Sequence, residues 1–455
     1  MTTTIPQIQT VPITREPAAS DHVDFVDQAS FLGLRATELS TLGQMVWIYE
    51  RDIDADRLRR FHGNLGQGLF GRRIERSRLP FGRHRWVLDS ACHPIDVELA
   101  PLPRAELQDW VHRHAQLPVD PEHGPSWRLG VTRFTDGATA VSLVVSHTIA
   151  DGVGLCRAIA DAANDATLPL GYALPRSRKR FRGIREDFRR TRRDMPDTAR
   201  AFRKATKMLT DRRQDIKHAG MPATEAHIDQ IPSVTVYLNE TEWDTNAHSR
   251  GGTSNSLVGA FAARLAAKAG RLGPDGKVTL SMPVNERTEG DVRANAMTSV
   301  MFAIDPVELT TDLGGIRGAT KKVLSDLRDT PDEKWALLPL TPFIPKAAAR
   351  RLANVALEYN DYPVGCSNVG PLDPEVNRPD GTPADYVFCK LAEQRVRPDK
   401  VLSTYGQLFV ASGRINDKIF LAVVGYQPGV IESRSDLTNM LTETLDDFGL
   451  HAVIE

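Results

Sequence analysis

The sequence predicts a mixed α/β protein, α+β or α/β in class, with two halves of similar size. Short apolar runs rich in β-branched residues alternate along the chain with segments whose apolar residues recur every three or four positions. The chain has 455 residues, of which 41% are hydrophobic and 25% charged, and this content is ordinary for a globular protein. Its length exceeds the usual size of one domain, so we expect two lobes.

Composition and local texture divide the chain into four parts. Residues 1–20 are rich in Thr and Pro, lack the apolar stretch of a signal peptide, and are expected to form a flexible N-terminal tail. We expect an N-terminal lobe over 21–175, a basic helical connector over 176–225 and a C-terminal lobe over 226–455. No run of about 18 apolar residues occurs, so no membrane-spanning segment is expected.

The four cysteines are too far apart in the sequence to form a recognisable pair. Cys92, Cys156, Cys366 and Cys389 include no CxxC spacing, which argues against a disulfide framework and against a zinc site. We therefore expect a cytoplasmic protein with no bound metal.

In the first half, strands and helices are predicted in alternation. Large apolar residues at every second position predict a strand over 127–131 with one buried face, and the Asp136-Gly137 pair predicts a hairpin turn to the next strand. The other predicted elements are strands at 46–50, 86–88 and 139–146, and helices at 54–65, capped by Asp54, and 104–116.

The second half has the same mixed texture. Helices are predicted at 257–269, closed by Gly270, and at 311–327 and 435–448. A hairpin is predicted with its turn within 413–418. Predicted strands lie at 233–239, 278–284, 296–305, 363–371, 401–412 and 419–426.

The stretch 141–156, VSLVVSHTIADGVGLC, is the centre of the predicted architecture. Its first residues form an apolar, β-branched run typical of a buried strand, and its last residues recur at helical spacing. His147 stands where the strand ends, a position at which a rigid support holds a side chain open to a ligand. We expect Gly152 to take a positive φ and so to let the chain turn tightly into the helix. A structural histidine with satisfied hydrogen bonds is the alternative.

Here the sequence resembles the superfamily of CoA-dependent and carrier-protein-dependent acyltransferases. His147, Asp151 and Gly152 match its HxxxDG motif. The superfamily includes peptide-synthetase condensation domains, polyketide-associated acyltransferases and wax ester/diacylglycerol synthases. Residues 282–287, MPVNER, resemble its PVNxR-type segment, and 367–371, SNVGP, resemble the NVxGP segment of the wax-synthase branch. The resemblance spans residues 39–450.

The resemblance implies a fold and a reaction. The fold is two chloramphenicol-acetyltransferase-like lobes with the active site in a tunnel between them. The reaction is transfer of an acyl group from a CoA or carrier-protein thioester to a hydroxyl or amine, in lipid or secondary metabolism. No cofactor is implied, because acyl-CoA or an acyl-phosphopantetheine carrier protein is a substrate. An acyl carrier protein is a possible partner.

His147 is the expected general base, because neutral imidazole is present near pH 7 and can take a proton from the attacking group. The resemblance further implies that Asp151 pairs with Arg287 in a structural ion pair that joins the two halves. A relay from Asp151 to the imidazole is the less favoured alternative. A covalent role for Cys156 is also open, although its apolar helical position favours a small core residue.

Two softer candidates lie beside these residues. Ser146 occupies the position where condensation domains and wax synthases usually have a second histidine, and it either donates a hydrogen bond near the oxyanion or simply ends the strand. Asn368 is a candidate for lining the tunnel. Two other functions stay open: a stand-alone condensation enzyme that forms an amide between carrier-bound partners, and a catalytically silent docking module.

Between residues 174 and 217 the chain is strongly basic. The simplest interpretation is a solvated helical connector between the lobes. Alternatives are a docking face for an acidic carrier protein, a site for CoA phosphates, or peripheral contact with an anionic membrane. Nucleic-acid binding is disfavoured, since no aromatic platform or known binding fold accompanies the charge.

Overall fold

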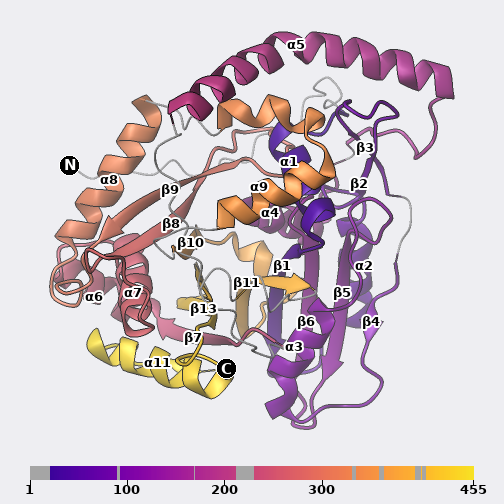
Figure 1. Ribbon diagram of the computed structural model, residues 1–455. Coiled ribbons are helices and arrows are strands. Elements are labelled where there is room, and N and C mark those ends of the chain that lie inside the picture. The colour runs from indigo at the N-terminus through magenta and orange to yellow at the C-terminus, as the bar shows by residue number, and fades with distance from the viewer. Residues whose placement is uncertain are drawn as a thin grey trace.

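The computed structural model describes residues 21–89, 93–168, 170–211, 230–329, 335–357, 363–394, 401 and 406–454. Within them the chain forms two main sheets, one centred in each half, with helices packed around both (Figure 1). The predicted mixed α/β class is confirmed. No helix in these ranges is long and apolar enough to cross a membrane. The tail 1–20 and Cys92 lie outside them.

The first sheet has five strands in the order β11-β1-β6-β5-β4. The predicted hairpin joins β5 to β6, and its turn places Gly137 at a φ of 93°. The edge strand β11 comes from the C-terminal part of the chain and pairs antiparallel with β1 along nine residue pairs. The strands are β1 (Ser40–Tyr49), β4 (Asp96–Val97), β5 (Trp127–Arg133), β6 (Thr139–Ser146) and β11 (Tyr386–Gln394).

Every residue of β6 is buried, because both faces of the sheet are covered. Met45, Trp47 and Leu143 point to the face that carries α2 and α4. Val46 and Ile48 point to the opposite face, where they meet α3 and the second sheet. The remaining elements of this half are α1 (Phe25–Thr37), α2 (Ala55–Leu65), β2 (Arg72–Glu75), β3 (Arg85–Leu88), η1 (Arg104–Glu106), α3 (Leu107–Ala115) and α4 (Gly152–Ala163).

The second sheet has seven strands in the order β14-β7-β13-β12-β10-β8-β9. The strand β10 runs parallel to both of its neighbours, and the other pairs are antiparallel. Its strands are β7 (Ser233–Asn239), β8 (Val278–Asn285), β9 (Met297–Ile304), β10 (Val364–Pro371), β12 (Gln407–Ile415), β13 (Lys418–Tyr426) and β14 (Val453–Ile454).

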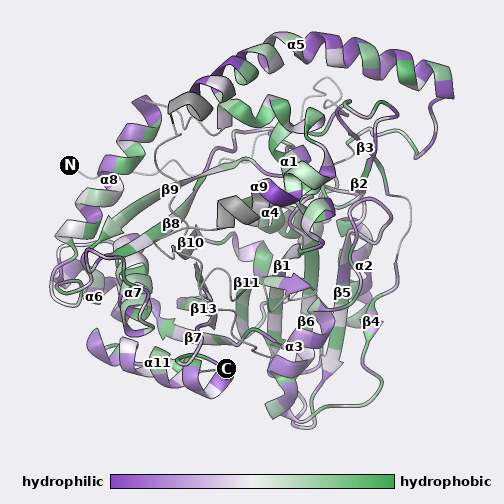
Figure 2. Cartoon of the chain, viewed as in Figure 1, coloured by the Kyte–Doolittle hydropathy of each residue, from purple (hydrophilic) through white to green (hydrophobic). Residues whose placement is uncertain are grey.

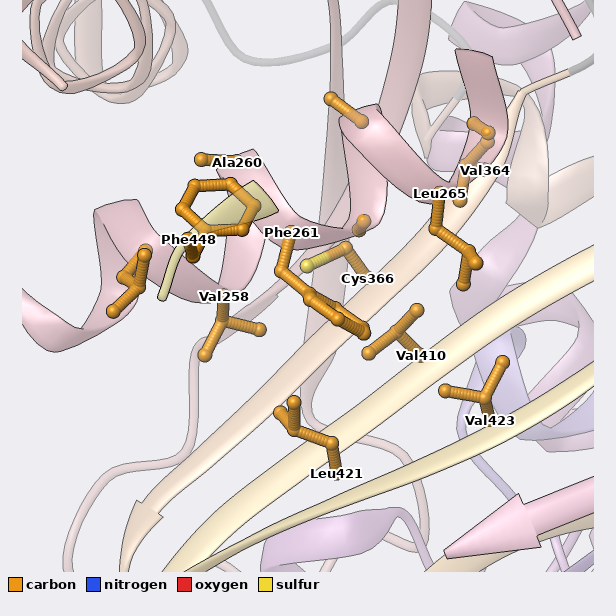
Figure 3. Packing of buried hydrophobic residues seen from close by; sticks show 14 of the residues in the cluster. Val258, Ala260, Phe261, Leu265, Val364, Cys366, Val410, Leu421, Val423 and Phe448 are labelled. Atoms are coloured by element: carbon orange, nitrogen blue, oxygen red, sulfur yellow. The ribbon is translucent and has the colours of Figure 1, made fainter. Parts of the chain in front are cut away.

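The core of the second lobe forms where α7 packs on this sheet. Thr253 caps α7 by accepting from the backbone N–H of Ser256. Phe261 and Leu265 then pack over Cys366, Val410 and Val423 of the strands (Figure 3). The other helices of this half are α6 (Glu240–Ser249), α7 (Ser254–Lys268), α8 (Gly314–Asp329), η2 (Trp335–Phe343), α9 (Lys346–Leu357), η3 (Pro374–Asn377) and α11 (Arg434–Asp447).

The basic stretch between the lobes contains one long helix, α5 (Arg180–Asp211), of 32 residues. In Figure 1 it runs along the outer edge of the molecule at the top. It packs against η2, which in turn contacts α1. The helical character predicted for this stretch is therefore present over 180–211.

Several local predictions need correction. Gly152 does not have a positive φ; it is the first residue of α4 and its backbone is helical. The simple alternation expected for 127–131 fails, because Gly130 is buried against the ring of His114 and Val131 is only half-buried. The turn expected within 413–418 contracts to Asn416-Asp417, both with positive φ, as in a two-residue hairpin.

Candidate active site

The loop that follows β6 fixes the backbone of His147 on both sides. Its N–H donates to the carbonyl of Thr41 on β1 at 3.0 Å, and its carbonyl accepts from Asn295 Nδ2 at 3.0 Å. One of these partners belongs to the first lobe and the other to the segment between β8 and β9. The imidazole is half-buried and has no hydrogen bond or ion pair within the described ranges, so it remains available to a ligand.

Asp151 and Arg287 form the ion pair that the family resemblance implied. Arg287 Nη2 lies 2.9 Å from Asp151 Oδ2, and the side chains are only 4% and 3% exposed. The carboxylate also accepts from the backbone N–H groups of Gly154 at 2.7 Å and Ala296 at 2.8 Å. Both oxygens are therefore occupied by donors other than the imidazole. This arrangement favours a structural role for Asp151 over a relay to His147.

Arg287 ties the segment between β8 and β9 to the motif. Its Nη1 donates to the carbonyls of Asp291 at 3.0 Å and Arg293 at 2.9 Å, and its Nη2 also reaches the carbonyl of Ala294 at 3.2 Å. The Ala294 carbonyl accepts from the N–H of Asp151 as well. A single guanidinium thus links the start of α4 to a loop of the other lobe.

A second buried carboxylate, which the sequence analysis did not identify, supports the same segment. Asp27 of α1 is completely buried and accepts from the N–H of Ala294 at 3.2 Å and from both nitrogens of Asn295 at 2.9 and 3.0 Å. Burial raises the pKa of Asp27 to about 6. Because Asn295 also bonds the His147 carbonyl, Asp27 lies two hydrogen bonds from the predicted base.

Of the two glycines at the start of α4, Gly154 leaves little room for a side chain, whereas Gly152, the glycine of the HxxxDG motif, has room for one. A Cβ at Gly154 would lie 3.1 Å from Asp151 Oδ1 and 3.2 Å from Arg287 Nη2, closer than most Cβ contacts. A Cβ at Gly152 would make only an ordinary 3.5 Å contact with Val369 Cγ1 of β10. That contact nevertheless shows that β10 approaches the start of α4.

The two softer candidates have local partners. Ser146 is buried, and its Oγ accepts from the N–H of Thr148 at 3.4 Å, which shapes the turn after the strand. Asn368 Oδ1 accepts from the N–H of Gly370 at 2.9 Å, and its Nδ2 donates to Asn255 of α7 at 3.4 Å. Within the described ranges, neither side chain bonds the His147 ring.

A cavity of about 320 Å³ lies between the two lobes, beside β11. His147 does not line this cavity, but Thr41, its backbone partner, does. Thr41 lies on β1, and His147 directly follows the neighbouring strand β6. Opposed residues on neighbouring strands are about 5 Å apart, so the cavity ends one strand away from the motif. Its polar lining residues are Thr41, Gln44, His112, Gln116, Ser233, Arg271, Lys390, Glu393 and Gln407.

The cavity contains a buried cation from β11. Lys390 is 7% exposed, and its ammonium donates to Ser233 Oγ of β7 at 2.8 Å. Burial lowers the pKa of Lys390 to about 8. Burial also raises the pKa of Glu393 and lowers that of His112. Of these three groups, Lys390 can therefore change its charge slightly above neutral pH.

Cys156 does not have the environment of a nucleophile. It is a free thiol on α4, and burial raises its pKa well above the ordinary value. A reactive cysteine needs a lowered pKa, so the geometry favours the core role. In the part of the chain that the structure describes, no three His, Cys, Asp or Glu side chains gather as metal ligands.

Comparisons with known proteins show the fold. No protein-family model matches the sequence, and no curated protein matches it. Among solved structures, the wax ester synthase/diacylglycerol acyltransferase from Marinobacter aquaeolei VT8 superposes with a TM-score of 0.55 at 17% identity, covering 94% of this chain and 100% of that one.

Two condensation domains give similar TM-scores. The first condensation domain of the calcium-dependent antibiotic synthetase gives a TM-score of 0.55 at 14% identity over 94% of this chain and 96% of that one. The starter condensation domain of rhizomide synthetase, solved with C8-CoA, gives 0.52 at 12% identity over 95% and 98%. The chain therefore has the two-lobed fold of the condensation-domain and wax-ester-synthase acyltransferases.

Proposed function

We propose that this protein is an acyltransferase in which His147 acts as the general base. The donor is a CoA or carrier-protein thioester and the acceptor is a hydroxyl or an amine. One observation carries the proposal: the motif histidine is held by its backbone between the two lobes while its ring has no partner within the described ranges. A ring held in this way is prepared to accept a proton from a bound substrate.

The reaction proceeds through a proton transfer coupled to attack on a carbonyl. The neutral imidazole takes the proton of the acceptor O–H or N–H as the acceptor atom bonds to the thioester carbon. The tetrahedral intermediate then collapses, the C–S bond breaks, and the thiolate leaves with the proton returned by the imidazolium. A positioned base of this kind contributes about 10²–10⁴-fold to the rate.

The rigid surroundings of His147 support this role. The Asp151–Arg287 pair and the Asp27–Asn295 contacts hold the loop from two directions. Correct placement of the base matters, because much of the advantage of an enclosed site comes from alignment of the reacting atoms. The interlobe cavity one strand away provides room for part of a substrate.

The fold comparisons support acyl transfer and are compatible with two classes of product, an ester and an amide. One neighbour is a wax ester synthase/diacylglycerol acyltransferase, and another is a condensation domain with an equal TM-score. The first favours an alcohol acceptor and an ester product. The second favours the alternative of a stand-alone condensation enzyme that joins carrier-bound partners through an amide. The starter condensation domain with C8-CoA favours a CoA donor.

A matrix of donors and acceptors tests the proposal. The full chain is incubated with acyl-CoA or with the same acyl group on a carrier protein, each with alcohol and amine acceptors. Products are identified by intact mass, and released thiol gives the rate. Ester formation from acyl-CoA supports the leading proposal, and amide formation between carrier-bound partners supports the alternative. Binding of the thioesters without turnover of any of them would leave a silent docking module.

A further inference from the structure

The long helix α5 turns its large apolar residues away from the protein. Over residues 180–207, whose side chains the structure describes, the buried residues are small or polar: Gly183, Asp187, Thr191, Thr198 and Ala201. The usual surface helix buries its apolar stripe and exposes its polar face. On α5 this order is reversed, so the exposed apolar residues need another explanation.

Four exposed residues follow one another at intervals of seven. Phe181, Phe188, Met195 and Phe202 are 86%, 58%, 45% and 61% exposed. Residues seven apart differ by only about 20° around a helix, so these four form one row on a flank of α5. At a rise of about 1.5 Å per residue the row is about 32 Å long. We call it the apolar row.

The rest of the exposed surface of α5 is basic. The helix carries eleven Arg and Lys and five Asp and Glu. Four of these acids already have partners: Glu186 pairs with Arg178 and Arg182, Asp187 with Arg178, Asp194 with Arg83, and Asp197 with Arg200. Figure 2 shows hydrophobic and hydrophilic segments alternating along this outermost helix. The positive charge therefore has few counter-charges on the helix itself.

Two of the exposed arginines stand directly beside the apolar row. Arg185 and Arg192 follow Phe181 and Phe188 by four positions, which places them on the same side of the helix one turn further on. Neither has an ion pair within the described ranges. An aromatic side chain and a free guanidinium thus alternate along this flank.

Two further exposed aromatic side chains lie on segments that contact α5. Phe81 and Phe343 are 37% and 40% exposed, and their rings stack with centroids 6.0 Å apart. Phe343 ends η2, which packs against α5. Phe81 lies in the loop where Ser77 Oγ and the N–H of Arg78 bond Asp187 of α5.

We propose that α5 binds the surface of an anionic lipid membrane, with the apolar row among the acyl chains and the flanking arginines on lipid phosphates and carboxylates. An exposed aromatic row flanked by arginine is the pattern of a helix that lies in the plane of a membrane interface. An acidic protein would match the charge but gives no reason for a continuous apolar row of about 32 Å. The proposal is independent of the catalytic activity.

Vesicle binding by the full chain tests the proposal. We expect cosedimentation with phosphatidylcholine vesicles that contain phosphatidylserine, weaker binding to phosphatidylcholine alone, and loss of binding at high salt. The variant Phe181→Ser/Phe188→Ser/Phe202→Ser should bind at least about tenfold more weakly. The variant Arg185→Gln/Arg192→Gln should lose roughly tenfold on anionic vesicles only.

A matched variant controls for the loss of exposed apolar surface. Leu99→Ser/Val307→Ser removes two side chains, 97% and 70% exposed, that follow β4 and β9, and its binding should equal that of the wild type. Thermal unfolding verifies that every variant is folded. Vesicle binding that the row variant retains would overturn the proposal. If the wild type is a dimer and the row variant is a monomer, the apolar row contacts a second copy of the chain instead. If the wild type binds an acidic carrier protein and no vesicles, α5 is a docking site for that protein.

Discussion

Removal of the Arg287 guanidinium tests how the lobes hold the loop that carries His147. Arg287→Met leaves the carboxylate of Asp151 buried, 3% exposed, without its counter-charge. It also removes the donor from three backbone carbonyls of the segment between β8 and β9. Loss of one partner of a buried pair costs about 3–5 kcal/mol, and we expect a loss in this range in the free energy of unfolding.

Urea denaturation followed by fluorescence measures this loss. Arg182→Met is the control, because Arg182 pairs with Glu186 on the surface and is 78% exposed. An exposed pair of this kind contributes less than about 1 kcal/mol.

The double variant Asp151→Asn/Arg287→Met separates the ion pair from a general effect of substitution. Neutralising the stranded carboxylate should return part of the lost stability, so the two single effects should not add and the difference should exceed about 1 kcal/mol. Strict additivity, or a loss for Arg287→Met no larger than that of the surface control, would show that this pair does not join the lobes.

Three further predictions concern the surroundings of the motif. Gly154→Ala should lose about 1–2 kcal/mol of unfolding free energy, because its Cβ would crowd the buried ion pair. The control Gly318→Ala should gain up to about 1 kcal/mol, because its Cβ meets nothing within 4 Å. Urea denaturation of both variants measures the difference. Since burial raises the pKa of Asp27 from 3.8 to about 6, the folded chain holds this proton more tightly, and about 3 kcal/mol of stability should be lost as the pH rises through this range. Asp27→Asn should flatten the pH dependence of the unfolding free energy there, and an unchanged slope would contradict the raised pKa. Cys156→Ala should keep the wild-type transfer rate, since burial raises the pKa of this thiol, and rapid alkylation of the wild-type residue at neutral pH would contradict it.

The sequence predicted best what is local. The β-branched run before His147 and the helical spacing after it occur as β6 and α4, because each pattern spans a few neighbouring residues. Asp54 caps its helix as predicted. The Asp151–Arg287 pair joins residues 136 positions apart and could be expected only from the resemblance to a known family.

Contacts between distant segments could not be predicted. The strand β11 comes from the C-terminal half of the chain and belongs to the first sheet because it pairs with β1. Nothing in the sequence of either strand specifies so remote a partner. Asp27 is not part of any recognisable motif, and its support of the segment that holds His147 follows only from its burial beside Asn295. The basic charge of α5 was visible in the sequence, but which flank of the helix would face the solvent depended on its packing against η2.

The measurement closest to the central claim is the rate of acyl transfer by His147→Ala under single-turnover conditions. The donor and acceptor are the pair identified for the wild type, and His123→Ala, whose side chain is 72% exposed, is the matched control. If His147 is the general base, its removal lowers the rate by about 10²–10⁴-fold while thermal unfolding and the control stay unchanged. A folded His147→Ala protein that transfers the acyl group at the wild-type rate would contradict the assignment.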